Sequence, residues 1–213
     1  TEHGRLDVLV NNAGYGQFGC TEDISLNDFR KQFETNFFSI VRIIQEVSPI
    51  MRKQKSGIIV NMSSVVGKIG LPGSSAYISA KFALEGFTEC LRHELYEKNS
   101  DKQIHAVLIE PGVVNTSFYD NMKVAKDARN VPKHKEMLDG MMAAGAQLFE
   151  NAMGPEEVSK KILRVLNEEN PEPRYRVGND SNQYWADRSV KTPLEFEATI
   201  RGMLEMMTDQ KPE

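Results

Sequence analysis

The segment Ser64-Val-Val-Gly-Lys-Ile-Gly-Leu-Pro-Gly-Ser-Ser-Ala-Tyr77-Ile-Ser-Ala-Lys81 decides how this sequence is interpreted. A lysine four residues after a tyrosine lies one helical turn away, where its ammonium group favours the phenolate. A phenol has a reference pKa of about 10 and needs such help to exchange a proton near neutral pH. A serine hydroxyl can donate to an oxygen that gains negative charge. Together these groups predict that Tyr77 acts as general acid or base on a carbonyl or an alcohol.

The spacing alone does not identify the site, because a second Tyr-x-x-x-Lys pair begins at Tyr119. Thirteen residues before Tyr119 stands Ala106, which has no hydroxyl group, whereas the same step before Tyr77 reaches Ser64. Ser64 also follows the apolar run at 57–62, which is typical of a buried strand. The first pair is therefore the candidate catalytic pair.

Segments typical of strands and helices alternate along most of the chain. The expected strands cover residues 6–10, 57–62, 103–109 and 174–178, and the expected helices cover 26–53, 76–98 and a run that starts at Pro155. Ser25 and Asp28 resemble a capping box for the first helix, and Pro49 is expected to bend or fray its last turns. This alternation predicts an α/β fold with a parallel sheet and helical crossovers.

Further motifs follow in the order and spacing of a known family. Asn11-Asn12-Ala13-Gly14 matches the motif after that family's fourth strand, and Asn36 matches the helix asparagine of its catalytic tetrad. Pro111-Gly112-Val113-Val114-Asn115-Thr116 matches the segment that meets the nicotinamide. With these motifs the chain resembles the short-chain dehydrogenase/reductase family over roughly residues 4–180. The resemblance implies a Rossmann-like doubly wound parallel sheet in a single domain, residues 1–213.

The resemblance also implies a reaction, in which hydride passes between a nicotinamide cofactor and a carbonyl or alcohol. Tyr77 would exchange the proton with the substrate oxygen, and Ser64 would hydrogen-bond that oxygen. Lys81 would favour the tyrosinate and bind the nicotinamide ribose, and the helix backbone at Asn36 would hold a water that links Lys81 to solvent. These four residues are the expected catalytic set.

The cofactor implied by the resemblance is NADP or NAD, and the residue that chooses between them is not identified. The residues expected to contact it are Asn11, Ala13, Gly14, Tyr77, Lys81, Pro111, Gly112, Val114 and Thr116.

One departure from the family pattern concerns the start of the chain. The family begins with strands and a glycine-rich turn that holds the cofactor's pyrophosphate at a helix N-terminus. This sequence begins at Thr1-Glu2-His3-Gly4, which corresponds to the end of the helix before the fourth strand. We therefore expect the first three strands of the family fold to be absent from the 213 residues, and the chain as given to bind the cofactor poorly.

Gly14, Gly16 and Gly19 form a Gly-x-Gly-x-x-Gly pattern that could be mistaken for that turn. A dinucleotide-binding fingerprint opens a helix at once, whereas the next helix here is expected only near Leu26. We interpret the pattern as a glycine-rich loop that lets the backbone pass close to a ligand or a neighbouring segment.

Residues 117–153 are expected to be the one irregular stretch between clear elements, and they are rich in methionine. They could form a core helix or a flexible apolar lid, since methionine adapts to varied ligand shapes. Their place after the Pro-Gly segment matches the substrate-binding loop of the family, which favours the lid. The residues expected to contact substrate are Phe18, Leu71, Phe118, Tyr119, Met122, Met141 and Met142.

The one indication of the substrate class is the segment Arg174-Tyr-Arg-Val-Gly178, at the end of the region that resembles the family. It resembles that of family members that act on lipophilic ketones and alcohols such as steroids, retinoids or acyl chains. Small ketones, sugars and 3-oxoacyl compounds remain alternatives.

Composition excludes several other classes. The net charge of −4 is spread along the chain without a basic stripe, which argues against a nucleic-acid partner. No apolar run is long enough to span a membrane, and the distant Cys20 and Cys90 suggest a reducing, cytoplasmic setting. The histidines, including His93 and His134, lack metal-ligand spacing, so no metal site is expected.

Apolar residues extend beyond one stripe on both long helices, as at Phe37, Phe38, Phe82, Leu84 and Phe87. A helix that is apolar on more than one side needs a second partner, and the family pairs these helices with their copies. We expect a homodimer or homotetramer. The alternative function is that of a truncated, catalytically inactive fragment that serves only as a dimerising binding module, with strand 6–10 as an exposed edge.

Overall fold

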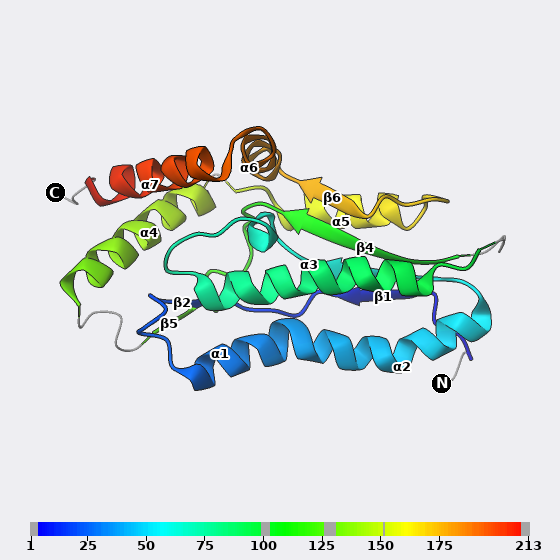
Figure 1. The fold of residues 1–213 in the computed structure, drawn as a ribbon. Coiled ribbons are helices and arrows are strands. Elements are labelled where there is room, and N and C mark those ends of the chain that lie inside the picture. The colour runs from blue at the N-terminus through cyan, green and yellow to red at the C-terminus, as the bar shows by residue number, and fades with distance from the viewer. Residues whose placement is uncertain (1–3, 99–102, 126–130, 151, 210–213) are drawn as a thin grey trace.

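The computed structural model describes residues 4–98, 103–125, 131–150 and 152–209. Four strands form a parallel sheet in the order β1-β3-β4-β6, and helices lie on both of its faces (Figure 1). The strands are β1 (Val8–Asn11), β3 (Gly57–Met62), β4 (Ile104–Pro111) and β6 (Arg174–Val177). The predicted α/β class with a parallel sheet and helical crossovers is confirmed.

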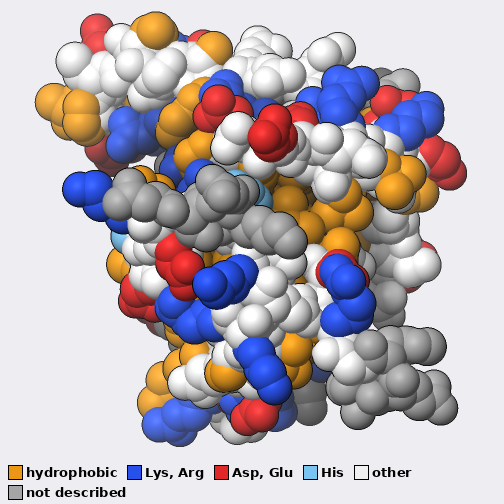
Figure 2. All heavy atoms as spheres, turned by 90° about the vertical axis from the view of Figure 1, so that its right-hand side faces the viewer, with side chains coloured by type: hydrophobic (Ala, Val, Ile, Leu, Met, Phe, Trp, Pro, Cys, Tyr) orange, Lys and Arg blue, Asp and Glu red, His pale blue; other side chains and the backbone are white. Residues whose placement is uncertain are grey.

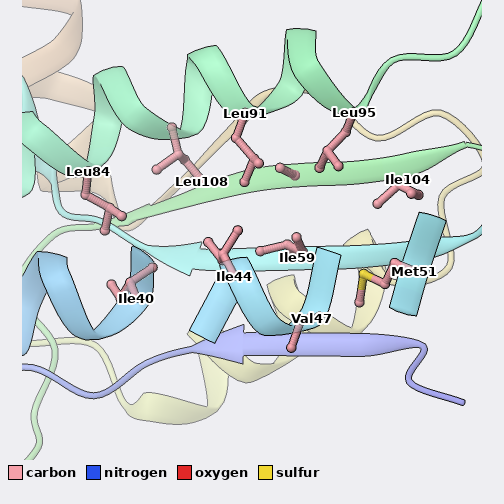
Figure 3. Packing of buried hydrophobic residues seen from close by; sticks show 11 residues of the cluster. Ile40, Ile44, Val47, Met51, Ile59, Leu84, Leu91, Leu95, Ile104 and Leu108 are labelled. Atoms are coloured by element: carbon pink, nitrogen blue, oxygen red, sulfur yellow. The ribbon is translucent and has the colours of Figure 1, made fainter. Parts of the chain in front are cut away.

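Two hydrophobic layers enclose the sheet. One face is covered by α2 (Ser39–Gln54) and α3 (Ser75–Leu95), whose apolar side chains meet those of β3 and β4 (Figure 3). Leu84 and Leu108 lie in this layer and are almost completely buried. The other face packs against α5 (Pro155–Val165) through Val158 and Val165. Both faces of β3 and β4 are largely buried, which explains why most of their residues are apolar.

The first long helix contains a turn of a different kind. It begins as α1 (Leu26–Phe33), passes through a π-helical segment, η1 (Glu34–Phe38), and continues as α2. Ser25 caps it by accepting a hydrogen bond from the Asp28 N–H, as predicted. Fraying at Pro49 was a wrong expectation, because the helix continues to Gln54. Met51 is fully buried beyond the proline, and this packing outweighs the lost backbone hydrogen bond.

A second, smaller sheet joins the glycine-rich loop to the region after β4. In this sheet β2 (Gln17–Phe18) pairs in parallel with β5 (Lys123–Val124). The Gly19 N–H donates to the Gly73 carbonyl at 2.8 Å. Gly19 has a φ of +147°, and a Cβ added there would lie 2.7 Å from the Cβ of Ala125. The Gly-x-Gly-x-x-Gly pattern therefore serves close approach of the backbone to a neighbouring segment and does not open a helix.

The region 117–153 differs from the expectation of an irregular stretch. It contains β5 and a long helix, α4 (Pro132–Glu150), and residues 126–130 and 151 lie outside the described part. The segment after Pro132 is rich in Ala, Met and Leu, whose helix propensity outweighs the cost of Gly140 and Gly145. The helix therefore forms despite two glycines in its interior.

β6 is the last strand of the described residues, as the sequence suggested, and two helices that the sequence did not predict follow it. They are α6 (Asn179–Val190) and α7 (Pro193–Asp209), and α7 lies beside α4 (Figure 1). Phe196 and Ile200 of α7 pack on Ile69, which follows β3, and so attach the C-terminal helices near the carboxyl ends of the strands.

The surface is mixed in charge, and no described helix has the length and apolar character needed to cross a lipid bilayer. The end of the molecule seen in Figure 2 shows basic and acidic side chains interspersed around small hydrophobic areas. This agrees with the small net charge of −4.

Candidate active site

A pocket of about 560 Å³ opens where β3 and β4 end. Its walls come from residues that follow three strands: Asn12 and Gly14 after β1, Ser64 after β3, and Val114 and Thr116 after β4. In open α/β sheets, ligands bind in the crevice outside the carboxyl ends of the strands. The pocket therefore lies where this architecture places a binding site.

The predicted catalytic residues converge on this pocket. Asn36, Ser64, Tyr77 and Lys81 all contribute to its lining. Tyr77 lies in the first turn of α3, and its hydroxyl is hydrogen-bonded to the Ser64 side chain. The second pair, which begins at Tyr119, is not part of the lining. Folding thus separates the two Tyr-x-x-x-Lys pairs as the position of the serine predicted.

Aromatic rings enclose Tyr77 on two sides. The ring centroid of Phe18 lies 6.1 Å from that of Tyr77, and the centroid of Phe118 lies 5.6 Å away. Phe18 comes from β2 of the small sheet and Phe118 from the segment between β4 and β5, so two separate segments place rings beside Tyr77. Burial raises the pKa of Tyr77 to about 12, and the hydrogen bond from Ser64 lowers it only in part.

Lys81 is buried near Tyr77, and its ammonium group is hydrogen-bonded to the backbone of β3. Its Nζ donates to the Met62 carbonyl at 2.6 Å and lies 5.7 Å from the centroid of the Tyr77 ring. Burial lowers the pKa of Lys81 to about 8, while the negative charge of Glu85 raises it. Burial is the largest cause of the shift at Tyr77, and the role of Lys81 toward the phenolate stays a prediction. The phenol is protonated at neutral pH, which suits it to give a proton to a carbonyl oxygen.

The buried side chain of Asn36 is satisfied by hydrogen bonds to the backbone. It lies in η1 and is fully buried, and its amide group pairs with the main chain of Tyr15. Its Oδ1 accepts from the Tyr15 N–H at 3.2 Å, and its Nδ2 donates to the Tyr15 carbonyl at 2.9 Å. In the same segment the Ser39 N–H donates to the Glu34 carbonyl, a step of five residues. Single π turns are frequent at functional sites, and no sequence pattern predicted this one.

The structure brings most of the expected cofactor contacts to the pocket. The ones that line it are Gly14, Tyr77, Lys81, Pro111, Gly112, Val114 and Thr116. Asn11 and Ala13 are not among the lining residues. The Asn11 side chain is buried, and its Nδ2 donates to Asn61 Oδ1 at 2.8 Å. Asn12 lines the pocket instead, and alternation of side chains at the end of a strand is the signal that could have identified it.

The expected substrate contacts divide into two groups. Phe18, Leu71 and Phe118 line the pocket, whereas Tyr119, Met122, Met141 and Met142 do not. The Tyr119 ring lies 4.6 Å from the ring of Phe149, centroid to centroid, and its hydroxyl lies 3.3 Å from the Met142 carbonyl. Phe149 itself lines the pocket, so α4 reaches it through a residue that sequence reasoning missed. Only the helix register, which the sequence did not reveal, decides that Phe149 faces inward.

Comparison with known proteins agrees with this geometry. The family described as short chain dehydrogenase matches residues 1–127, which is more than half of the chain. The chain belongs to the short-chain dehydrogenase family. A 3-ketodihydrosphingosine reductase from Bacteroides thetaiotaomicron is 33% identical over 178 residues, which are 84% of this chain and 65% of that protein. The chain therefore spans slightly less than two thirds of this relative.

Solved structures of short-chain dehydrogenases share the fold. A short-chain dehydrogenase from Streptomyces avermitilis superposes with a TM-score of 0.75 at 29% identity, covering 94% of this chain and 73% of the other. ElxO with NADP bound gives a TM-score of 0.65 at 27% identity, covering 85% of this chain and 69% of the other.

A buried pair of carboxyl groups lies behind the pocket of this short-chain dehydrogenase. Glu85 is on α3, one turn after Lys81, and Glu110 immediately precedes the Pro111 of the pocket wall. Arg174 lies between them, with its Nε 3.1 Å from Glu85 Oε2 and 3.6 Å from Glu110 Oε1. Burial raises the pKa of Glu110 to about 7, helped by the charge of Glu85 and opposed by nearby cations.

This raised pKa predicts a pH-dependent stability. The folded protein holds the Glu110 proton up to about pH 7, whereas the unfolded chain releases it near pH 4.5. The free energy of unfolding should therefore decrease as the pH rises through this window. Urea denaturation at pH 5 and pH 7.5 should show a smaller decrease for Glu110→Gln than for the wild type. Glu89→Gln, at an exposed carboxylate that also pairs with Arg174, is the control, and an equal decrease in all three proteins would contradict the prediction.

Proposed function

We propose that this protein is an oxidoreductase that transfers hydride between a nicotinamide cofactor and a carbonyl or alcohol substrate. The observation that carries the proposal is the convergence of Ser64, Tyr77 and Lys81 on one pocket at the carboxyl ends of the strands. A hydroxyl donor, a phenol and a buried ammonium group are what proton exchange with a carbonyl oxygen requires.

The residues of the pocket fit a nicotinamide cofactor. The pocket combines apolar walls such as Val114 with polar groups gathered near Lys81, and a Cβ on Gly14 would lie only 3.4 Å from the Asn36 amide. Bound NADP or NAD would supply or accept the hydride. Gly14, Val114 and Thr116 would hold its nicotinamide end, and Lys81 would bind its ribose hydroxyls.

Side chains of the protein transfer the proton to the substrate oxygen and stabilise the charge left on the tyrosine. Ser64 donates to the substrate oxygen and keeps it beside the Tyr77 hydroxyl. Tyr77 then gives its proton to this oxygen as the carbonyl becomes an alcohol. The positive charge of Lys81 stabilises the tyrosinate that remains, and the η1 backbone at Asn36 would hold a water through which Lys81 exchanges protons with solvent.

We propose a lipophilic or 3-oxoacyl-like carbonyl compound as substrate. Phe18, Leu71, Phe118 and Phe149 make the wall around Tyr77 largely apolar. Among relatives at a third or more identity, one is named a 3-ketodihydrosphingosine reductase and another a retinol dehydrogenase. Both names refer to lipophilic molecules, which supports the same class here.

Deuterium transfer tests this function directly. A form of the protein that binds cofactor is incubated with NADPH or NADH carrying deuterium at nicotinamide carbon 4 and with a panel of long-chain 3-oxo compounds and small ketones. Deuterium on the carbinol carbon of the product, found by mass spectrometry, is the expected result. If ligand binding is detected while no deuterium is transferred from either cofactor, the inactive binding module is the correct function instead.

We propose that residues 117–153 close over the substrate. Phe118 and Phe149 bring both ends of this segment to the pocket, and Leu138 of α4 packs near the loop at Gly73. Hydrogen exchange should be faster in α4 than in α3 and should slow when an apolar ketone binds. Equally slow exchange in both helices, unchanged by any ligand, would make α4 a purely structural element.

We also propose a homodimer or homotetramer built on α2 and α3. Phe38, Ile43 and Phe82 remain more than 40% exposed on this side of the molecule. Leu84, in contrast, is fully buried in the core, so it was wrongly assigned to this surface from the sequence. Sedimentation should give at least twice the monomer mass at micromolar concentration, and Phe38→Glu with Phe82→Glu should yield a folded monomer. A wild-type monomer would contradict the proposal.

A further inference from the structure

Side chains with metal-binding donors meet at the start of α4, outside the pocket. Within the described part of the chain, Cys20, Asp23 and His134 place one donor atom each within 4.8 Å of one another. None of them lines the pocket. We propose that these three residues bind a Zn²⁺ ion that ties the start of α4 to the turn at residues 20–23. Thiolate, imidazole and carboxylate are the donors that zinc takes in proteins.

A tight turn holds two of the donors together. The N–H groups of Asp23 and Ile24 both donate to the Cys20 carbonyl, at 2.9 and 3.2 Å. The two donor residues are therefore three positions apart on a closed turn, the same step as in the Cys-x-x-Cys loops of zinc sites. Cys20 is half-buried, and the Asp23 side chain is only 8% exposed. The turn is thus ordered and partly shielded from water before any ion binds.

The third donor, His134, is oriented from both sides of its ring. Its Nδ1 lies 2.8 Å from Asp23 Oδ2, and its Nε2 lies 2.9 Å from Glu22 Oε1. A neutral imidazole carries one N–H and cannot donate to both carboxylates. A cation at Nδ1 satisfies both contacts, because Nε2 then donates its proton to Glu22; a doubly protonated ring would satisfy them as well, and the cobalt test below separates the two. A metal-bound histidine that donates its other N–H to a carboxylate is the usual arrangement in metal sites.

The donors need only small movements to hold an ion. Tetrahedral ligands at about 2.1 Å from zinc are about 3.3 Å apart, so Asp23 and His134 would separate by about half an ångström from their 2.8 Å contact. Rotation of the Cys20 side chain would close the remaining gap. Water could fill the fourth position, since Glu22 stays on the Nε2 side of the His134 ring.

The charges at the site favour a dication. The carboxylates of Asp23 and Glu22 lie on the two sides of the His134 ring, 2.8 and 2.9 Å from its nitrogens. The same two carboxylates attract a cation, and binding to the sulfur displaces the proton into solvent, since a coordinated thiol is deprotonated.

The ion would connect two parts of the fold that flank the active site. Ile24, next to the turn, packs with Leu138 of α4 and with Ala76, the residue before Tyr77. Zinc would therefore fix the start of α4 against the first turn of α3. The sequence predicted no metal site because His134 is 111 residues from Asp23 and only the folded chain brings them together.

Cobalt substitution tests the site through its own spectrum. Co²⁺ added to the metal-free 213-residue protein should produce a thiolate-to-cobalt charge-transfer band in the near ultraviolet, and Zn²⁺ should displace it. Cys20→Ser, Cys20→Ala and His134→Asn should each remove the band and the rise in melting temperature that Zn²⁺ causes. Circular dichroism verifies that these variants are folded.

Matched controls use the same residue types elsewhere on the chain. Cys90→Ser changes the other free, exposed thiol, and His93→Asn changes a histidine outside the cluster. Both should keep the cobalt band and bind Zn²⁺ with unchanged affinity by calorimetry. The proposal is overturned if no band forms with the wild type, if the band survives Cys20→Ser, or if it is lost in Cys90→Ser.

Discussion

Tyr77→Phe should lower the rate of carbonyl reduction by about two to four orders of magnitude, the usual contribution of a general acid. The substitution removes the hydroxyl that Ser64 orients and leaves the ring between Phe18 and Phe118. The packing volume does not change, so the melting temperature should remain close to that of the wild type. Steady-state rates with a lipophilic ketone, measured on a form of the protein that binds cofactor, give the comparison.

Tyr119→Phe is the matched control for this loss. Tyr119 also has a lysine four residues later, but it lies against Phe149 outside the pocket lining. Its hydroxyl reaches only the Met142 carbonyl, at 3.3 Å. The rate should stay near that of the wild type. Near wild-type turnover in Tyr77→Phe together with loss in Tyr119→Phe would show that the catalytic assignment is wrong.

Leu84→Ala should lower the free energy of unfolding by about 3–5 kcal/mol, the cost of a cavity left by a fully buried leucine. Leu84 is 0% exposed and lies on α3, three residues after Lys81, in the layer that faces β3 and β4 (Figure 3). Truncation removes apolar contacts on both α2 and the sheet. Urea denaturation followed by circular dichroism measures the loss.

Leu163→Ala provides the same chemical change on the surface. Leu163 lies on α5 and is 60% exposed, so its truncation should change the free energy of unfolding by about 0.5 kcal/mol or less. Equal losses in the two variants would mean that the layer between α3 and the sheet does not carry the stability of the fold.

Much of this protein was predictable because local patterns agree with the global fold. The run at 57–62 forms a strand with those bounds, since a short and mostly apolar run is typical of a strand buried on both faces. Ser25 caps α1 because capping depends on residues three positions apart. The spacing from Ser64 to Tyr77 placed both residues at one pocket, because a strand end and the following helix start meet at the same edge of the sheet.

Other features depend on contacts between distant residues, which no local pattern encodes. The sequence could not show that Lys81 would bond to the Met62 carbonyl, or that burial would raise the pKa of Tyr77 to about 12. The sequence also could not show that Asn12 would line the pocket while the side chain of Asn11 is buried against Asn61.

The sequence by itself determined the four strands of the main sheet, the helices between them and the set of groups available for proton exchange, because these follow from periodicity and spacing along the chain. Tertiary structure alone decided the environment of those groups and the meeting of His134 with Asp23 across 111 residues. Burial, charge and donor geometry arise from packing between segments far apart in sequence, and packing sets the pKa values and the metal-binding donors of this fold.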